Sequence, residues 1–287
     1  MTRRGILALC LLLAGVTHAA PVRVVDDAGL TLELARTPQR IVSLTPHLTE
    51  LLFAVGAGEQ LVGVDSASDF PEAARGLPRV GDYSRVSFER ILALKPDLVL
   101  VWLGGNRPVD IHGLKAMKLP LLHTRAAKLD DVARLLRLLG RASGHPVQGE
   151  RAAQQFAQRL AVLEERYASR RPIPVFYQVW DRPLMTVGGG HWISEALTVC
   201  GARNVFADLA ALSPVVSREA VLTRGPEVIV SGSDAPAVRS QWERYAELPA
   251  ARTGAFLRID ADRLHRPSPR LLDGVVQLCE AIAPYGR

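Results

Sequence analysis

One long helical segment divides this chain. Residues 148–170 contain no strand-forming run, and their apolar side chains recur at the spacing of one helix face. These side chains are Phe156, Leu160, Leu163 and Tyr167. The segment is longer than the mean globular helix of about 11–12 residues, and Arg171-Pro172 ends it. With strands and helices alternating on both sides, it predicts a rigid strut between two lobes. The alternative is one more layer helix of a single domain.

Short apolar runs typical of buried strands alternate with helical stripes on both sides of this segment. Before it, strands are expected at 41–44, 61–64, 98–102 and 120–123, and helices from Pro46 and at 87–94, 109–117 and 129–140. After it, the alternating elements are expected at 174–179, 191–200, 217–223, 228–231, 237–244, 256–259 and 268–283. A hairpin is expected at 22–34, with its turn at the Asp/Gly cluster 26–29.

Alternation of this kind indicates parallel sheets covered by helices. The predicted fold is therefore α/β, with two parallel-sheet α/β lobes joined by a single long α-helix. We expect a segment 1–20 that is removed, an N-terminal lobe at 21–145, the connecting helix at 146–171, and a C-terminal lobe at 172–287.

The two predicted lobes share a repeated unit. Ser87 is followed by Glu89, an apolar pair and then Pro96-Asp97 at the start of an apolar run; Ser217, Glu219 and Pro226-Glu227 keep the same spacing. Serine is a preferred helix N-cap, and an acid in the first turn complements the helix dipole. Any helix-to-strand unit could carry such residues, but the identical spacing favours equivalent units in two related lobes.

The N-terminus has the pattern of a secretory signal. Arg3 and Arg4 precede the apolar run 6–16, and small residues follow at 17–20. We therefore expect cleavage after Ala19 or Ala20 and a periplasmic protein. Removal of this segment leaves 33 Lys and Arg against 29 acids, a formal charge of +4.

Two cysteines, Cys200 and Cys279, remain after the segment 1–20 is removed. An even pair in an exported chain usually forms a disulfide. Two separate buried thiols are the alternative.

Motifs for catalysis are lacking in the sequence. There is no Gly-x-Ser-x-Gly elbow, phosphate loop or His-Glu-x-x-His motif, so we expect no catalytic residue. Gly188-Gly189-Gly190 lacks the rest of a phosphate-binding pattern and is expected to be a flexible turn. The histidines are scattered, which argues against a metal site. No basic cluster with interleaved aromatics supports nucleic-acid binding. An enzyme such as a hydrolase using Asp262 or His191 remains the less favoured class.

Aromatic residues mark a binding site instead. Trp102 and Trp180 stand at the carboxyl ends of predicted strands, and Tyr83 lies in the loop before the Ser87 helix. Ligands of open α/β sheets bind outside these strand ends, so an aromatic from each lobe would sandwich a flat ligand. The alternative is that the rings complete each lobe's core. Trp192 fits either role, and Trp242 is expected to pack in the core.

Glu89 and Glu219 form a second candidate site. On the surface, each would merely complement a helix dipole, worth under about 1 kcal/mol. Two equivalent acids, one in each lobe, would also give a two-point footprint for a basic protein partner.

From about Arg40 to its C-terminus the chain resembles the periplasmic cobalamin-binding proteins of ABC importers. The resembling stretches are 43–50, 62–64, 68–71, 89–102, 104–106, 199–201, 204–206, 216–219, 268–270 and 278–279. The resemblance implies two α/β lobes with little hinge motion and a transported corrinoid rather than a resident cofactor. It also implies docking of Glu89 and Glu219 on arginines of a membrane permease dimer, a Cys200–Cys279 disulfide, and a monomer.

The resemblance also implies a set of ligand contacts. Tyr83 takes the place of a cleft tryptophan, and Trp102 matches another. The remaining expected contacts are Pro46, Ala67, Asp262, Arg263, Leu264, His265 and Arg266, together with Trp180, which is expected from its strand end and not from the resemblance. Ala67 and Ser213 stand where the family has a tyrosine and a tryptophan, while Trp180 adds a ring the family lacks. The hairpin is more typical of relatives that bind haem or an iron-siderophore, which are therefore the alternative ligands. Asp82 stands where the haem-binding relatives carry their ligating tyrosine, which counts against haem.

Overall fold

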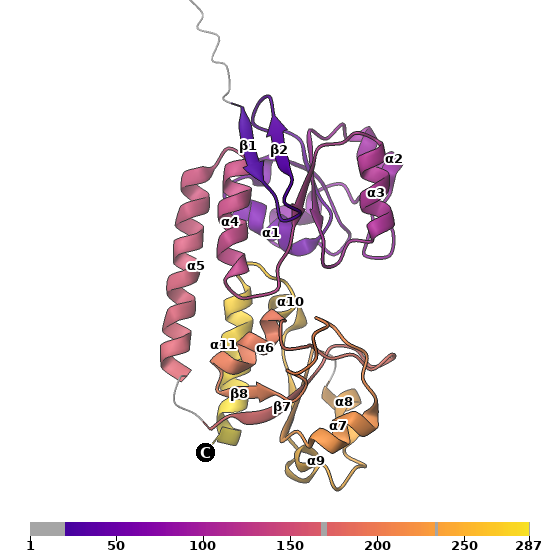
Figure 1. Cartoon of the computed structure of the whole chain (residues 1–287), viewed down its shortest axis with the longest axis vertical. Helices are drawn as coiled ribbons and strands as arrows, with labels where there is room; N and C mark the ends of the chain where they lie inside the picture. Colours follow the sequence, from indigo (N-terminus) through magenta and orange to yellow (C-terminus); the bar gives the residue numbers. More distant parts are fainter. Residues whose placement is uncertain (1–20, 168–170, 233–234, 287) are drawn as a thin grey trace, which may run out of the picture.

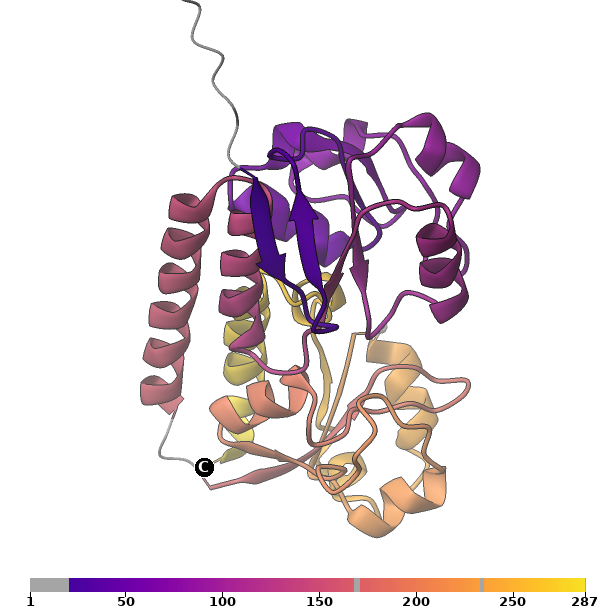
Figure 2. The ribbon, with the colours of Figure 1, turned by 45° about the horizontal axis from the view of Figure 1, so that its top comes forward.

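A computed structural model of the chain describes residues 21–167, 171–232 and 235–286 (Figure 1). Two lobes lie one above the other, and one long helix runs along the side of both (Figures 1 and 2). The predicted signal segment 1–20 and the last expected residues of the connecting helix, 168–170, lie outside the described residues.

The N-terminal lobe is built on a four-stranded parallel sheet with the order β4-β3-β5-β6. Its strands are β3 (Ile41–Ser43), β4 (Leu61–Val64), β5 (Leu98–Trp102) and β6 (Leu121–Thr124). Its helical elements are α1 (Pro46–Ala54), η1 (Gly58–Gln60), η2 (Glu72–Gly76), α2 (Phe88–Ala93), α3 (Pro108–Ala116) and α4 (Asp131–Ala142). All four strands match the expected positions to within one or two residues.

The C-terminal lobe repeats this topology. Its parallel sheet has the order β10-β9-β7-β8, so in both lobes the strands lie in the order second, first, third, fourth. The strands are β7 (Ile173–Gln178), β8 (Ala202–Asn204), β9 (Val228–Ser231) and β10 (Phe256–Arg258). The helices are α6 (Trp192–Val199), α7 (Arg218–Arg224), α8 (Ala235–Trp242), α9 (Pro249–Thr253), α10 (Ala261–Leu264), α11 (Leu271–Ile282) and η3 (Ala283–Gly286). The short elements β8, α9 and α10 were not predicted.

The repeated unit has the same structure in both lobes. Ser87 and Ser217 are N-caps, and their hydroxyls accept the backbone N–H of the residue three positions later. The acid after each proline lies just before the third strand of its lobe. It bonds to residues just before the first strand of the same lobe. Asp97 accepts the N–H groups of residues 39 and 40, and Glu227 pairs with Arg171 at 2.6 Å. The motif therefore helps to align each sheet.

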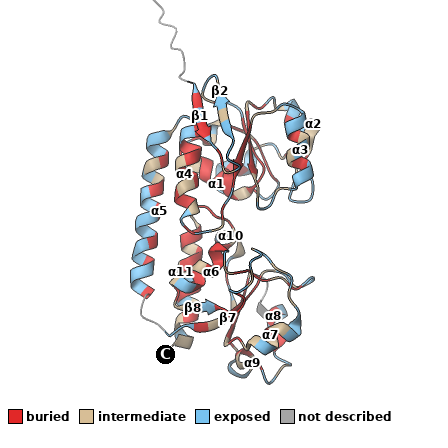
Figure 3. Ribbon diagram, viewed as in Figure 1, coloured by how far each residue is buried: buried red, intermediate tan, exposed pale blue. Residues whose placement is uncertain are grey.

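The connecting helix α5 (Pro146–Tyr167) packs against α1 and α4 in one lobe and against α6 and α11 in the other. Its buried face is formed by the predicted apolar stripe (Figure 3). Gly140 and Gly149 let α4 and α5 approach closely, because a Cβ at either would lie within 2.8 Å of the facing helix backbone. One hydrophobic cluster continues through α5 into both lobes, which opposes independent movement of the lobes.

The N-terminal hairpin, β1 (Val22–Val25) and β2 (Thr31–Leu34), is antiparallel as expected. Asp26 joins it to the sheet, because its carboxylate lies 2.6 Å from Nδ1 of His123 at β6. Burial would raise the pKa of Asp26, but the hydrogen bonds from the His123 side chain and from the backbone of Leu30 and His123, with the charge of His123, together outweigh it and the pKa is lowered.

Two further expectations concern the C-terminal lobe. The Cys200–Cys279 disulfide is present and joins the end of α6 to α11. The triple glycine, expected to be a flexible turn, is tightly packed instead. A Cβ at Gly188 or Gly189 would lie 2.1 Å from a backbone carbonyl oxygen of the segment 207–211, so glycine is required there for close approach of two backbones.

Candidate functional site

The carboxyl ends of the N-terminal strands contact the other lobe. Trp102 ends β5, and its ring centroid lies 6.4 Å from that of Trp192 in α6. Leu129, just before α4, donates its N–H to Glu195 of α6 at 2.7 Å. Because open parallel sheets bind ligands outside the carboxyl ends of their strands, this boundary is the candidate site.

Trp102 forms part of the packed boundary between the lobes. His47 of α1 meets its ring edge-on at 4.9 Å, and the ring is only partly exposed. Gly104 and Gly105 lie directly against it, since a Cβ at Gly105 would be 2.2 Å from the ring. Neither Trp102 Nε1 nor His47 Nε2 has a hydrogen-bond partner among the described residues. The ring is held in place from three sides.

Trp180, just beyond the carboxyl end of β7, has a different setting. Its side chain is 60% exposed, and its Nε1 donates to the carbonyl of Arg182 at 3.1 Å. An isolated bridge pairs it with Met185, which in turn pairs with Val215, itself 63% exposed. Trp180 and Val215 therefore leave apolar side chains open to solvent on the C-terminal lobe.

Three further expected contacts lie in the N-terminal lobe. Tyr83 is 88% exposed on a turn in which the Asp82 carboxylate accepts the N–H groups of Ser84 and Arg85. Ala67 is exposed after β4, and Pro46 is half-buried at the first position of α1. The structure therefore presents Tyr83 and Ala67 to solvent and keeps Pro46 partly covered.

The segment 262–266 divides into exposed and buried side chains. Asp262 and Arg263 are exposed on α10. Leu264 is fully buried, and its carbonyl accepts the Trp192 indole N–H at 2.9 Å. His265 lies 2.9 Å from the Tyr177 hydroxyl, and burial lowers its pKa. Only part of the segment is thus open to a ligand, since Arg266 is also buried.

Arg266 belongs to an ion cluster between the lobes that was not predicted from the sequence. Glu50 of α1 is at its centre and is only 4% exposed. Around it lie Arg266, Ser268 and Arg270 from the segment before α11. One signal was available: Glu50 is a charged residue within the apolar stripe of α1. Its partners, more than 200 positions away in the sequence, could not be identified.

Two other histidines are buried at this boundary. Burial, reinforced by the charge of Arg266, lowers the pKa of His47 to about 3. Burial beside His265 lowers that of His191 to about 3 as well. His191 caps α6 by accepting the N–H of Ile193, and its ring lies 3.8 Å from Trp192. Both imidazoles are therefore neutral at physiological pH.

The two predicted docking acids lie in equivalent first turns of α2 and α7. Glu89 and Glu219 are exposed, and neither carboxylate forms an ion pair with any described residue. The pKa of Glu219 is lowered by hydrogen bonds from its own backbone N–H and from Ser217. Both acids are thus exposed and open to a basic partner.

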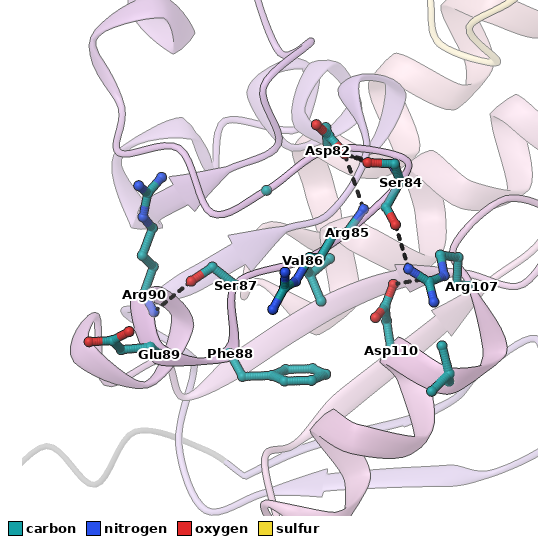
Figure 4. Close-up of a pocket in the computed structure, with 12 residues that line it drawn as sticks. Asp82, Ser84, Arg85, Val86, Ser87, Phe88, Glu89, Arg90, Arg107 and Asp110 are labelled. Carbon is teal, nitrogen blue, oxygen red and sulfur yellow. Dashed lines mark hydrogen bonds and ion pairs between the residues drawn. The ribbon is translucent and has the colours of Figure 1, made fainter.

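A hollow of about 780 Å³ lies beside Glu89 (Figure 4). Arg85, Arg90 and Arg107 line it together with Phe88 and Val109. Arg107 lies 3.9 Å from the Asp110 carboxylate and bonds the Ser84 carbonyl. Glu89 points to the opposite side from Phe88 in this view. This hollow is therefore a surface feature of the α2–α3 face, separate from the boundary between the lobes.

No group of three or more His, Cys, Asp or Glu side chains in the described residues could hold a metal ion. Among the helices that the structure describes, none combines the length and the apolar character needed to cross a bilayer.

The chain is similar to known binding proteins over most of its length. The sequence pattern of the periplasmic binding protein family matches residues 41–263. The vitamin B12-binding protein of Vibrio parahaemolyticus is 37% identical over 87% of this chain and 92% of its own. The vitamin B12-binding protein of Vibrio cholerae is 40% identical over 84% of this chain and 88% of its own.

Solved structures agree with this similarity. The periplasmic vitamin B12 binding protein BtuF of Vibrio cholerae has a TM-score of 0.80 and 39% identity, covering 86% of this chain and 98% of its own. The periplasmic heme-binding protein RhuT of Roseiflexus has a TM-score of 0.77 and 27% identity, covering 87% and 99%. These structures confirm the two-lobe α/β fold expected from the sequence. The matching family consists of binding proteins, as expected from a sequence without catalytic motifs. The chain belongs to the periplasmic binding protein family.

Proposed function

We propose that this protein captures cobalamin or a related corrinoid between its two lobes. The observation that carries the proposal is the identity of 37–40% to vitamin B12-binding proteins over at least 84% of both chains. The described residues support it, because flat rings stand exposed in both lobes near the carboxyl ends of strands.

In this proposal Trp180 and Tyr83 provide open stacking surfaces, and Trp102 contributes the exposed part of a fixed wall. Flat aromatic rings give large contact areas at small conformational cost. Asp262 and Arg263 supply polar groups at the rim. Leu264, His265 and Arg266 act mainly by holding that rim in place, since most of their surface is buried. Pro46 and Ala67 complete the N-terminal side of the site.

Delivery would follow by docking on the permease of an ABC transporter in the inner membrane. Glu89 and Glu219 would meet basic residues on the two permease subunits, one for each lobe, so a single copy of the protein suffices. Exposed carboxylates that form no ion pair within the described residues break no ion pair of their own when they dock. Export through cleavage of the segment 1–20 would bring the protein to the periplasm.

Haem or an iron-siderophore is the second candidate cargo. The solved haem-binding relatives share the fold at up to 27% identity, and Tyr83 presents an exposed hydroxyl. Titration separates the candidates.

Calorimetric titration of the purified protein with cyanocobalamin, cobinamide and haemin tests the cargo. We expect corrinoid binding, weakened about tenfold by Trp180→Ala, which corresponds to about 1.4 kcal/mol. Tyr285→Ala, in η3 after α11, is the control and should leave binding unchanged. Binding of haemin with a new Soret band, and no heat with either corrinoid, would replace the proposal with the haem alternative.

Transport into proteoliposomes containing the permease tests docking. Glu89→Ala combined with Glu219→Ala should strongly reduce uptake while the calorimetric affinity stays the same. Glu164→Ala with Glu165→Ala removes two exposed acids from α5 and serves as the control. Wild-type uptake by the Glu89/Glu219 variant would show that these acids only stabilise their helices.

A further inference from the structure

The segment before α11 is held by the opposite lobe. Glu50, on α1 of the N-terminal lobe, accepts hydrogen bonds at both carboxylate oxygens. Arg270 donates from Nη2 and Nε at 2.5 and 3.0 Å, the Ser268 hydroxyl at 2.6 Å, and Arg266 Nη1 at 3.2 Å. A single buried carboxylate thus binds three side chains of the other lobe.

Further groups complete the cluster around Arg266. Asp69, in the loop after β4, accepts from Arg266 Nη1 at 2.6 Å, and Asp262 of α10 accepts from Nη2 at 2.6 Å. Burial would raise the pKa of Asp69, but the bond and charge of Arg266, a backbone hydrogen bond and the charge of Arg270 together lower it. The Arg270 guanidinium lies 3.8 Å from the centre of the Phe70 ring. Groups of both lobes therefore surround both arginines.

The cluster also reaches the aromatic wall of the candidate site. His47 lies on α1 with Glu50, close enough for the charge of Arg266 to lower its pKa. His47 in turn meets Trp102 edge-on at 4.9 Å. A displacement of Arg266 would thus be transmitted through α1 to the ring that faces Trp192.

Directional contacts of this kind have a role that the apolar core cannot perform. Hydrophobic contacts tolerate small sliding because they have no preferred direction. Buried charge-assisted hydrogen bonds are short and fixed in geometry, and removing one partner leaves an uncompensated charge. The cluster therefore fixes one spacing between the lobes.

We propose that Glu50 is a positioning residue that sets the spacing of the two lobes and thereby the width of the ligand site. The effect on affinity rests on the proposed function; the effect on spacing does not. Asp69 shares this role from the loop after β4, and Arg266 acts as the bridge rather than as a free ligand contact.

Spin-label distance measurements test the spacing without any ligand. Labels on Ala116→Cys in α3 and Ala246→Cys after α8 report on the two lobes, and both positions are exposed. In the protein without the segment 1–20 the introduced cysteines are the reactive thiols, because Cys200 and Cys279 are bonded to each other. The labelled protein that retains Glu50 should give one narrow distribution of distances between the two labels.

Glu50→Gln should broaden or shift that distribution and weaken cyanocobalamin binding about tenfold, or 1.4 kcal/mol. The control is Asp273→Asn, which removes an exposed ion pair with Arg159 inside the α5–α11 contact and should change neither. An unchanged distribution in Glu50→Gln overturns the proposal, whatever the affinity. If the parent protein does not bind cyanocobalamin, the cargo proposal fails while the distance result still stands.

If Glu50→Gln does not fold, the triple variant Glu50→Leu, Arg266→Met and Arg270→Leu replaces the ions by apolar side chains of similar size. Such replacements commonly preserve or raise stability. A broadened distribution in this folded variant supports the positioning role. A narrow, wild-type distribution shows that the apolar core alone sets the spacing and overturns the proposal.

Discussion

The two lobes share a strand order and a capped helix-to-strand unit, yet the tryptophans near the carboxyl ends of their strands have different settings. Trp102 ends the third strand of its sheet and is enclosed by His47, Trp192 and two glycines. Trp180 follows the first strand of its sheet and is 60% exposed. A tryptophan near the carboxyl end of a strand therefore has a different role in each lobe. One ring completes the contact between the lobes, and the other remains available to a ligand.

The lobes also differ in how they are stabilised. The C-terminal lobe has the Cys200–Cys279 disulfide across α6 and α11, whereas the N-terminal lobe has a hairpin joined through Asp26 and His123. Both lobes share the core that runs through α5. This comparison leads to three measurements, ordered from the largest expected effect to the smallest.

Replacing Cys200 and Cys279 by alanine should lower the free energy of unfolding by about 4–5 kcal/mol. The chain-entropy account gives this value for a sequence separation of 79 residues. Hydrogen exchange should show that β7 and β9 lose more protection than β3 and β5. Equal losses in the two lobes would contradict a lobe-specific role, and reduction of the wild-type protein provides an independent comparison.

Trp102→Ala should lower the free energy of unfolding by about 3 kcal/mol, because it leaves a cavity between packed elements. Trp180→Ala should change it by less than about 0.5 kcal/mol, as expected for an exposed side chain. Urea denaturation of the two variants measures the difference directly. Similar losses from both would remove the distinction between a packed ring and a ligand contact.

Acid should destabilise the boundary between the lobes through His47 and His191. Their folded-state pKa of about 3 lies below the unfolded value near 6.5, so the unfolded chain binds more protons at pH values between the two. Stability is therefore lost as the pH falls from 6.5 toward 3, by about 2 kcal/mol for each histidine between pH 7.5 and pH 5. His47→Gln should reduce this loss in urea titrations, and the exposed His112→Gln should not.

Much of the fold could be predicted because its signals are local. The apolar stripe of α5, the hairpin turn and the capped helices each depend on residues a few positions apart. The identical spacing around Ser87 and Ser217 also predicted that the two lobes contain equivalent units. Short elements were missed, since β8 and α10 span only three and four residues and carry too little periodicity to detect.

The candidate site was predicted less completely. The resemblance placed Tyr83, Trp102 and the segment 262–266 together as ligand contacts, but their burial differs greatly. Leu264 and Arg266 face inward, while Tyr83 is almost fully exposed. Exposure depends on neighbours from other elements, which no local pattern specifies.

By itself, the sequence determined the elements, their order and the repeated unit, because the hydrophobic period and the capping residues act within a few positions. Only the tertiary structure decided that Glu50 meets Arg266 and Arg270 across more than 200 residues. It also decided that Trp102 is enclosed while Trp180 is open. Such contacts arise when separate elements pack, and their energies depend on burial and distance that exist only in the folded chain.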